Sequence, residues 1–281
     1  MKSILIAISI LSMSIGVVGQ NLKEDLLNNA IKINQLDDLN PAIYNKLNDF
    51  NCIMIGEMHG TNEPANFLIG LTKLLTEGDD SVQVGFEIPD GKMENFLELK
   101  TDSSVYQSEF FNDNSNDGRN SIAWLNALVT LNNNPKVNIF FFDVNKSDYN
   151  VSNNRDSLMY VKIKRKISEK PHWKTLTISG NIHNMLKPYK DKKTAAHYLI
   201  NDEDMELSET LCTLNHFYQK GTMLNNIGNG LELRAIDNGA SIFSETINSD
   251  NYLYLFSEPK SHSGFIFTKI ITASTTLTNE N

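Results

Sequence analysis

The stretch CIMIGEMHGTNEP, residues 52–64, decides the expected fold, because an apolar run passes into a polar loop and then into the start of a helix. Its first five residues are typical of a buried strand. Thr61 or Asn62 then suits the position that caps a helix. Glu63 and Pro64 follow in the first helical turn, where a carboxylate and a missing N–H are both favourable, so we assign Glu63 to helix stability rather than to catalysis.

The same alternation of strand and helix continues along the chain. Further buried strands are predicted at 82–88, 137–143 and 174–179, and helices at 63–77, within 91–133 (two helices) and at 155–169. Strands that alternate with helices pair in parallel through right-handed crossovers. The prediction is an α/β fold with a mostly parallel central sheet and helices on both of its faces.

The regions that flank this core are less regular. Leucines and isoleucines three or four residues apart predict helices within 21–48. The C-terminal half has short, partly alternating segments, which predict additional antiparallel strands near a sheet edge. These segments are 194–200, 208–217, 231–236, 252–257 and 264–270. The polar stretch 112–120 has nothing apolar to bury, so we expect a mobile surface loop there.

Length and charge narrow the classes of protein further. The chain has 281 residues, of which 40% are hydrophobic, and we expect residues 20–281 to form a single domain. It carries 25 Lys and Arg against 34 Asp and Glu, a formal net charge of −9, and it has no basic run. Nucleic acid is therefore not an expected partner.

Residues 1–19 have the pattern of a secretory signal peptide. Lys2 gives a cationic start, 4–18 is mostly apolar, and small residues precede Gln20. The alternative is an uncleaved anchor, but the apolar run is about 15 residues long and about 20 are needed to span a bilayer. We expect a secreted or periplasmic protein with no transmembrane segment after cleavage.

Two cysteines, Cys52 and Cys212, can pair in an oxidising compartment. Cys52 opens an apolar run, however, where a buried free thiol is the commoner state. We therefore expect no disulfide.

Polar side chains follow all four predicted strands. In an open parallel sheet the ligand crevice lies beyond the carboxyl ends of the strands, so these side chains are expected at one rim. They are Glu57, His59, Glu87, Asp143, Asn181 and His183. Glu57 and His59 are two residues apart and point to the same side of an extended chain. Each residue alone has a structural alternative, such as a hydrogen-bonded loop histidine, and the functional interpretation depends on their convergence.

Three carboxylates beside two imidazoles cannot all remain charged and unpaired. A cation can lie among them, Arg155 and a protonated histidine can neutralise them, or one carboxyl can keep its proton. Arg155 opens the helix after the third strand and is the natural counter-charge. A local salt bridge at the start of that helix is the alternative role for Arg155.

Motifs of several other site classes are absent from the sequence. It has no His-Glu-x-x-His, no Cys-x-x-Cys, no Gly-x-Ser-x-Gly and no phosphate-binding glycine loop. A serine hydrolase of the usual α/β type is therefore disfavoured. The remaining histidines are expected to be structural or exposed; they are His172, His197, His216 and His262.

Taken in order, several blocks resemble those of the erythromycin esterase-like and ChaN-like superfamily, which also includes Tiki-type proteases. The blocks are GEMHGTNEP (56–64), FEIP (86–89), FFDVN (141–145), NRDSLMYVKI (154–163), GNIHN (180–184) and SGFIFTKIITAS (263–274). The resemblance spans about residues 50–275 and implies an α/β fold with its site at the strand ends.

What the resemblance implies for function differs between branches. Esterase-like members imply His59 as a base that activates water, with Glu57, Glu87 and His183 around it. ChaN-like members imply haem or iron binding at the cell surface. Tiki-like members imply a divalent metal on Glu57 and His59. Only Met58 separates Glu57 from His59, where the macrolide enzymes are expected to have two residues, so a macrolide is not the expected substrate.

The leading prediction is a secreted hydrolase of an ester, amide or related bond in a small molecule or peptide. His59 takes a proton from water, Glu57 or Glu87 orients the His59 ring, and His183 protonates the leaving group. Arg155 or Asn181 donates to the oxyanion, and Asn181 and Asp143 contact the substrate.

Two other predictions stay open. One is a haem- or metal-binding protein without turnover, with Glu57, His59 and His183 as the metal ligands. The other is a surface interaction module whose rim charges are already tied up in pairs.

Overall fold

The structure, a computed structural model, describes residues 17–78, 80–113, 117–148, 154–226, 228, 230–239 and 245–277. Residues 1–16 of the predicted signal peptide lie outside the described residues. The helices are α1 (Val17–Asn29), α2 (Pro41–Leu47), α3 (Glu63–Glu77), α4 (Glu94–Leu99), α5 (Asp102–Tyr106), α6 (Ile122–Asn132), α7 (Arg155–Glu169) and α8 (Ala195–Ile200). The strands are β1 (Ile31–Ile33), β2 (Cys52–Glu57), β3 (Val82–Pro89), β4 (Val137–Asp143), β5 (Lys174–Gly180), β6 (Leu211–Asn226), β7 (Leu231–Asp237), β8 (Asn251–Leu255) and β9 (Gly264–Ile271).

The described strands form one sheet in the order β1-β8-β9-β6-β2-β5-β3-β4, and β7 pairs with β6 off this path. The run β9-β6-β2-β5-β3-β4 is parallel throughout. The pairs β1–β8, β8–β9 and β6–β7 are antiparallel. The predicted α/β class, with a mostly parallel sheet and antiparallel strands in the C-terminal half, is confirmed.

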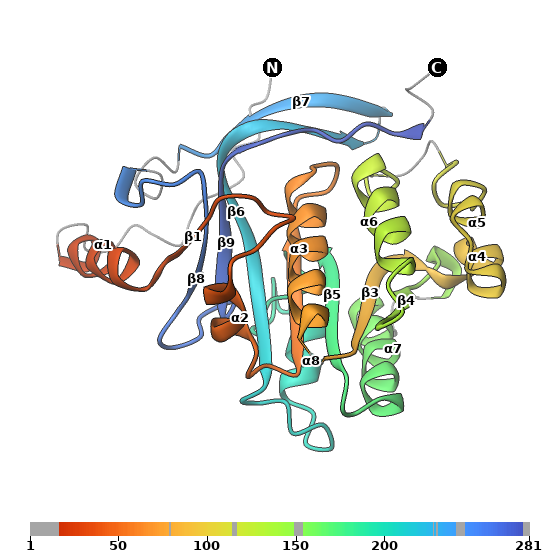
Figure 1. Ribbon diagram of the computed structural model, residues 1–281, viewed down its shortest axis with the longest axis horizontal. Coiled ribbons are helices and arrows are strands. Elements are labelled where there is room, and N and C mark those ends of the chain that lie inside the picture. Colours follow the sequence, from red (N-terminus) through yellow and green to blue (C-terminus); the bar gives the residue numbers. More distant parts are fainter. Residues whose placement is uncertain are drawn as a thin grey trace.

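The strand order explains why helices cover both faces. From β2 the chain moves to β3 and β4 in one direction, and it then returns to β5 and β6 in the other. Right-handed crossovers in opposite directions put α3 and α6 on one face and α7 and α8 on the other (Figure 1). The loops after β2 and β5, which are neighbours, therefore leave toward opposite faces. A crevice is expected at such a point, beyond the carboxyl ends.

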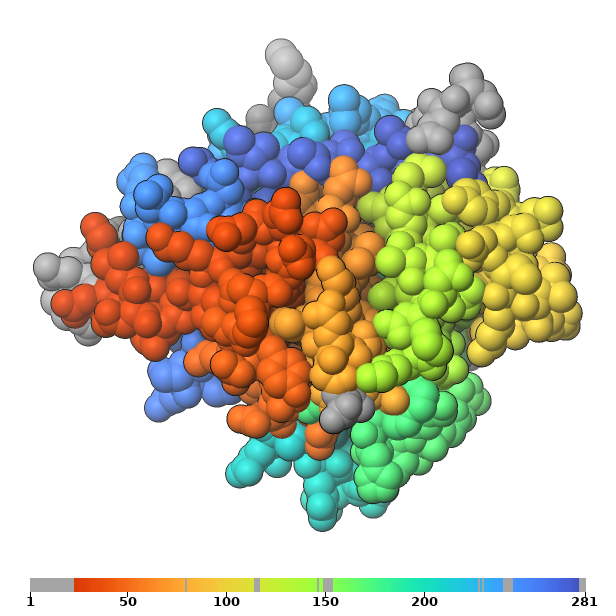
Figure 2. Space-filling model, in the orientation of Figure 1, coloured from red at the N-terminus to blue at the C-terminus, as the bar shows by residue number. Residues whose placement is uncertain are grey.

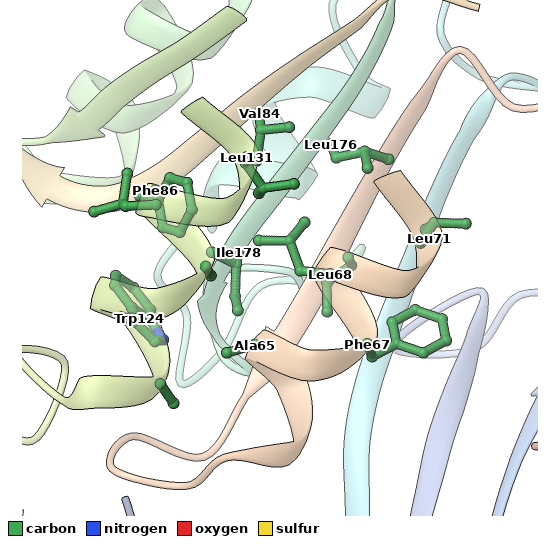
Figure 3. Packing of buried hydrophobic residues seen from close by; sticks show 14 of the residues in the cluster. Ala65, Phe67, Leu68, Leu71, Val84, Phe86, Trp124, Leu131, Leu176 and Ile178 are labelled. Carbon is green, nitrogen blue, oxygen red and sulfur yellow. The ribbon is translucent and has the colours of Figure 1, made fainter. Parts of the chain in front are cut away.

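The hydrophobic core is correspondingly divided by the sheet. On the first face Phe67 and Leu71 of α3 and Trp124 of α6 pack against the strands (Figure 3). On the second face Met159 of α7 and Ala195 of α8 do the same. The strands between these layers are buried on both sides, which is why they read as nearly continuous apolar runs.

The cysteines show the effect of this two-sided burial. Cys52 lies opposite Leu211 and Ile53 lies opposite Cys212 in the parallel pair β2–β6. Because neighbouring residues of a strand point to opposite faces, Cys52 packs with α7 and α8 and Cys212 packs with α3. Both thiols are buried and free.

Segment 194–200 was expected to be a strand and is helix α8. The Thr194 side chain accepts a hydrogen bond from the His197 N–H, and Ala195, Ala196 and Leu199 are buried on one helical face. Six helical residues span fewer than two turns, too few to separate a helical from a strand pattern, so the capping threonine was the usable signal. The other four C-terminal segments overlap β6, β7, β8 and β9, so strands are confirmed there, but β6 lies inside the sheet and pairs in parallel with β2 and β9.

The N-terminal and central helical regions also hold more elements than predicted. Within 21–48 the short strand β1 lies between α1 and α2 and pairs with β8. Within 91–133 there are three α-helices, α4, α5 and α6, after a 3₁₀ turn at Asp90–Met93. In Figure 2 the red N-terminal segment lies beside α3, and the yellow α4–α5 segment lies beyond α6. No helix of the described part is both long enough and apolar enough to cross a membrane.

The polar stretch 112–120 was expected to be a mobile surface loop, and this is wrong for its last four residues. Residues 114–116 lie outside the described part. Gly118 and Asn120 are buried, and the Arg119 side chain is only 12% exposed. The loop turns inward because buried carboxylates at the strand ends attract Arg119.

An extension of the sheet covers the carboxyl ends of the central strands. The distal half of β6, with β7 and the end of β9, arches across the ends of α3 and α6 (Figure 1). Beneath it the loop after β2 approaches so closely that a Cβ on Gly60 would lie 1.7 Å from the Leu224 carbonyl oxygen. Gly118, on the loop before α6, also lies against Leu224 and Gly60. Glycine at both positions lets two loops meet under the arch.

Replacing Gly60 by alanine is expected to lower the free energy of unfolding by about 2 kcal/mol or more, because a positive φ and a backbone clash add together. Gly228→Ala is the matched control, since Gly228 also has a positive φ but has nothing within 4 Å of its Cβ position. Urea unfolding of both variants measures the difference. Equal destabilisation would contradict the close packing under the arch.

Candidate functional site

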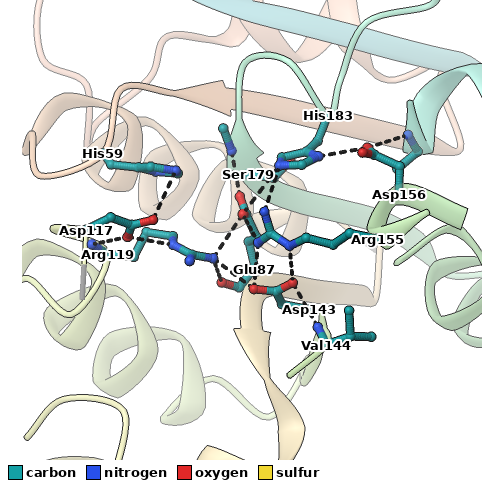
Figure 4. Close-up of polar contacts among 12 residues, drawn as sticks. His59, Glu87, Asp117, Arg119, Asp143, Val144, Arg155, Asp156, Ser179 and His183 are labelled. Carbon is teal, nitrogen blue, oxygen red and sulfur yellow. Dashed lines mark hydrogen bonds and ion pairs between the residues drawn. The ribbon is translucent and has the colours of Figure 1, made fainter. Parts of the chain in front are cut away.

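The predicted rim residues come together at the carboxyl ends of β2, β3, β4 and β5 (Figure 4). Glu57 ends β2, Glu87 lies near the end of β3, and Asp143 ends β4. His59 and His183 lie on the loops that follow β2 and β5. The crevice position expected from the strand order is therefore where the chemically active side chains meet.

The first histidine is held by a carboxylate on its own loop. His59 Nδ1 is hydrogen-bonded to Glu57 Oε1, and the Trp124 indole N–H donates to Glu57 Oε2 at 2.9 Å. Both oxygens of the buried Glu57 are therefore engaged, and the carboxylate cannot swing away from the ring. His59 Nε2 points instead toward the solvent-exposed side of the rim, where Asp117 Oδ2 lies 3.9 Å away.

Glu87 is completely buried and is surrounded by donors. Its Oε1 accepts from Arg155 Nη2 at 2.5 Å and from Arg119 Nη1 at 2.9 Å. Its Oε2 accepts from the Gly180 backbone N–H at 2.7 Å. Burial disfavours the charge, but Arg119, His183 and the other nearby cations hold the pKa of Glu87 well below its usual value.

Asp143 is shared by the same two arginines. Arg155 binds it through Nε and Nη2 at 2.8 and 2.7 Å, a bidentate pair, and Arg119 Nη1 donates at 3.0 Å. The Val144 N–H also donates to it at 2.8 Å. Of the alternatives left open by the sequence, the described residues therefore show arginine neutralisation. Arg155 reaches across the rim rather than forming a local salt bridge.

Arg119 is the main residue that sequence reasoning missed. In the sequence it lies in a polar loop between two helices and follows no strand. Only its positive charge, opposite to that of the rim carboxylates, could have indicated it. Asp117, Trp124 and Asp156 were missed as well. Asp117 holds Arg119 Nε at 2.8 Å, which makes the loop part of the site.

The second histidine is also held by a carboxylate. His183 Nδ1 lies 2.7 Å from Asp156 Oδ1, which the Ala195 N–H of α8 also binds at 3.0 Å. His183 Nε2 lies 3.3 Å from Arg155 Nη1 and 3.6 Å from Glu87 Oε1. Neutral His183 accepts from Arg155 there, whereas the protonated form directs an N–H toward Glu87.

Gly180 separates the two imidazoles. A Cβ at this position would lie 3.2 Å from His59 Cε1, 3.3 Å from His59 Nε2 and 3.7 Å from His183 Cδ2. The two rings therefore flank one point above the Gly180 backbone. A side chain there would crowd the His59 ring, so glycine at this position lets the two imidazoles approach the same stretch of backbone.

The charges at the rim favour protonation of both histidines. Burial opposes the charge on His59, but Glu57, Glu87 and Asp117 raise its pKa to about 9. Burial also opposes the charge on His183, and Glu87 and Asp156 raise its pKa above the usual value despite Arg155. Each histidine therefore has a proton to give near neutral pH, and His59 becomes a base as the pH rises.

Asn181 occupies a different position from the one predicted. Its Oδ1 accepts from the His216 N–H at 2.8 Å, and its Nδ2 donates to the His216 carbonyl at 3.2 Å. A Cβ on Gly56 would lie 2.1 Å from Oδ1, so glycine there makes room for this amide. Asn181 thus extends the pairing between strands through its oxygen and one of its two amide hydrogens.

The remaining histidines have structural settings or are exposed. His216 is buried with Nε2 3.2 Å from Thr268 Oγ1, and burial lowers its pKa to about 3. His262 Nε2 lies 3.0 Å from the Asn181 carbonyl oxygen. His197 Nδ1 lies 2.9 Å from the Leu186 carbonyl oxygen, and His172 is exposed.

The proposed metal ligands do not fit a metal. The oxygens of Glu57 are bound to His59 and Trp124, and His183 has Arg155 beside Nε2. Among the described residues no three His, Cys, Asp or Glu side chains form a group that could hold an ion. A haem fits no better, because charged groups flank both imidazoles where a macrocycle needs broad apolar walls.

No protein-family model and no curated protein matches this chain. Solved structures do resemble it. A protein from Bacillus cereus has a TM-score of 0.69 at 10% identity, covering 92% of this chain and 99% of its own. A His-to-Asn mutant of the erythromycin esterase EreC has a TM-score of 0.55 at 10% identity, covering 85% and 96%. ChaN of Campylobacter jejuni, which binds haem, has a TM-score of 0.40 at 13% identity, covering 63% and 85%.

The first two similarities confirm the expected resemblance at the level of fold. This chain shares the α/β architecture of the erythromycin esterase over nearly the whole length of both chains. At identities near 10% the shared property is the fold alone.

Glu87→Gln is expected to lower the free energy of unfolding by about 3 kcal/mol, because it leaves two largely buried guanidinium groups short of one negative charge. The pKa of Glu87 is lower in the folded than in the unfolded state, so its charge stabilises the fold fully above the unfolded-state pKa and stops doing so only as the pH falls through the folded-state pKa. The decrease in unfolding free energy caused by Glu87→Gln should therefore be as large at pH 5 as at pH 7. Urea unfolding at both values, with Glu77→Gln at an exposed site as control, checks this. Equal, small effects of the two substitutions would contradict it.

Proposed function

We propose that this protein is a hydrolase that acts outside the cytosol on an ester, amide or related bond, with His59 as the general base. The observation that carries the proposal is a pair of histidines, each oriented by a carboxylate, that flank the backbone of Gly180. The signal-like pattern of residues 1–19 supports export. The fold shared with an erythromycin esterase is compatible with hydrolysis.

His59 is suited to take a proton from water. Its Nδ1 is fixed on Glu57, so the neutral ring carries its hydrogen on Nδ1 and has a free lone pair on Nε2. When Nε2 takes a proton, Glu57 stabilises the resulting imidazolium. The Trp124 N–H prevents Glu57 from turning away, so the base keeps its orientation through the reaction.

The other side of the reacting group faces cations. Arg155 Nη1 and His183 Nε2 lie 3.3 Å apart beside Gly180, and both carry hydrogens when His183 is protonated. Arg155 can donate to an oxyanion, and His183 can give its proton to the leaving group. Glu87 and Asp143 hold Arg155 in place and do not themselves contact the reacting atoms in this mechanism.

The substrate class is a small molecule or a peptide with a carbonyl group that can enter between the two imidazoles. The arginine charges are already balanced by Glu87 and Asp143, and Asp117 adds a further carboxylate beside His59. A strongly anionic substrate is therefore disfavoured, and neutral or cationic groups are preferred near the scissile bond.

A second candidate, a surface interaction module without turnover, is favoured by one observation: Glu87 and Asp143 are fully paired. The two candidates differ at His59, whose Nε2 is directed to the exposed side of the rim. A module without turnover needs no such base.

His59→Gln is expected to lower kcat by about 10²–10⁴-fold on a substrate that the wild type hydrolyses, because the water loses its proton acceptor. A panel of p-nitrophenyl esters and coumarin-linked peptide amides supplies the assay. His172→Gln, at an exposed position, is the matched control and should retain full activity. Full turnover by His59→Gln, or no turnover of either class by the wild type, would remove the basis for the proposed hydrolase.

The pH profile follows from the same assignment. Because the pKa of His59 is raised to about 9, the fraction of neutral base increases about tenfold per pH unit below that value. We expect kcat/KM to rise about tenfold per pH unit at the acidic end, where both histidines are protonated, and to stop rising once His183 begins to lose the proton that the leaving group takes. An acidic limb that persists unchanged in His59→Gln would show that His59 is not the titrating base.

Gly180→Ala tests where the substrate binds. The new methyl group would lie in ordinary or slightly tight contact with both imidazoles, and Gly180 has no positive φ, so we expect little loss of stability. The methyl would occupy the reaction space, and kcat/KM should fall about 10²-fold. Gly91→Ala, whose Cβ position has its nearest neighbour at 3.8 Å, is the matched control. Unchanged kinetics in Gly180→Ala would place the substrate elsewhere.

A further inference from the structure

Asp117 faces the free nitrogen of His59 from a loop that contributes no strand end. Its Oδ2 lies 3.9 Å from His59 Nε2, and its Oδ1 accepts from Arg119 Nε at 2.8 Å. The Asp117 side chain is 37% exposed and that of His59 is 22% exposed, so solvent reaches both groups. In Figure 4 the carboxylate lies between the His59 ring and the Arg119 guanidinium.

We propose that Asp117 is a catalytic residue that holds the attacking water against His59; this inference rests on the hydrolase function proposed above. At neutral His59 both Nε2 and Oδ2 are hydrogen-bond acceptors, and they are too far apart to bond to each other. A separation of 3.9 Å lets one water donate a hydrogen to each, at about 2.8 Å from both. The lone pairs of that water then face away from both acceptors.

The position of Asp117 is tied to the charge cluster. Arg119 holds Asp117 through Nε, while its Nη1 donates to Glu87 and Asp143. Next to Asp117, Gly118 packs against Gly60 of the loop that carries His59. The two acceptors are therefore anchored to each other twice, once through side chains and once through backbone.

The chemical step is balanced with this water. Its oxygen forms the bond to the carbonyl carbon as one O–H proton passes to His59 Nε2. The second hydrogen stays on the oxygen and is held by Asp117. When the carbon–heteroatom bond breaks, the leaving group takes the proton of His183 and the carbonyl is restored. The products are a carboxylic acid and an alcohol or amine, with no other reactant.

The charge of Asp117 also acts on the pKa of His59, which can be measured independently of activity. The charged groups that act on His59 are Glu57, Glu87 and Asp117, and all three raise its pKa. His59 and Arg119 in turn lower the pKa of Asp117 against the effect of burial, so this carboxylate is ionised at neutral pH. Removing its charge should lower the pKa of His59 while Glu57 still orients the ring.

The test is Asp117→Asn, measured in two ways on the full chain. The pKa of His59 is followed by NMR of ¹⁵N-labelled imidazole and should fall by a measurable fraction of a unit or more. The kcat should fall about 10²-fold with little change in KM, because the water is no longer positioned. Asp250→Asn, at an exposed carboxylate, is the control and should change neither value.

A second variant keeps the inference testable if the asparagine perturbs the loop. Asp117→Ala should lose the same activity and regain part of it in added formate, which can occupy the carboxylate position. An unchanged kcat, an increased kcat, or a His59 pKa that does not move would each overturn the role of Asp117. Loss of activity in His59→Gln alongside an unaffected Asp117→Asn would overturn this inference and leave the proposed hydrolase intact.

Discussion

Two arginines shared between two buried carboxylates are the interaction on which the rest of the site depends. Glu87 and Asp143 end neighbouring strands, where two negative charges out of water would be strongly unfavourable alone. Arg119, in the loop before α6, precedes β4 in the sequence, and Arg155, at the start of α7, follows it; both bind the two carboxylates. The cluster therefore ties together the ends of β3 and β4, the start of α7 and the loop before α6.

The cluster also connects to the loops that carry the two histidines. Glu87 binds the Gly180 N–H, which fixes the end of β5 and the turn that carries His183. Arg119 fixes Asp117, which faces His59. Glu57 and Asp156 bind the Nδ1 atoms of His59 and His183, and the Nε2 atoms of the two rings face Asp117 and Arg155, respectively. The charge cluster thus holds the loops in place, and separate carboxylates orient the rings.

The sequence predicted much of this arrangement because strand ends are readable from local patterns. The runs before Glu57, Glu87, Asp143 and His183 are buried on both faces, so their apolar character marks both the strands and the residues that follow them. Arg119 was not predictable in this way. A polar loop looks solvated in sequence, and its burial depends on carboxylates distant along the chain. The prediction for segment 194–200 failed for a different reason, because six helical residues span fewer than two turns and so short a run does not separate helix from strand.

The central claim is that the arginine–carboxylate cluster acts as one unit. A double-mutant cycle on the free energy of unfolding tests it most directly, with Asp143→Asn, Arg155→Gln and the combined variant. If the bidentate pair is part of one buried network, the double variant should be less destabilised than the sum of the single ones by about 1–3 kcal/mol. Effects that add to within about 0.5 kcal/mol would contradict it, because independent groups behave in that way.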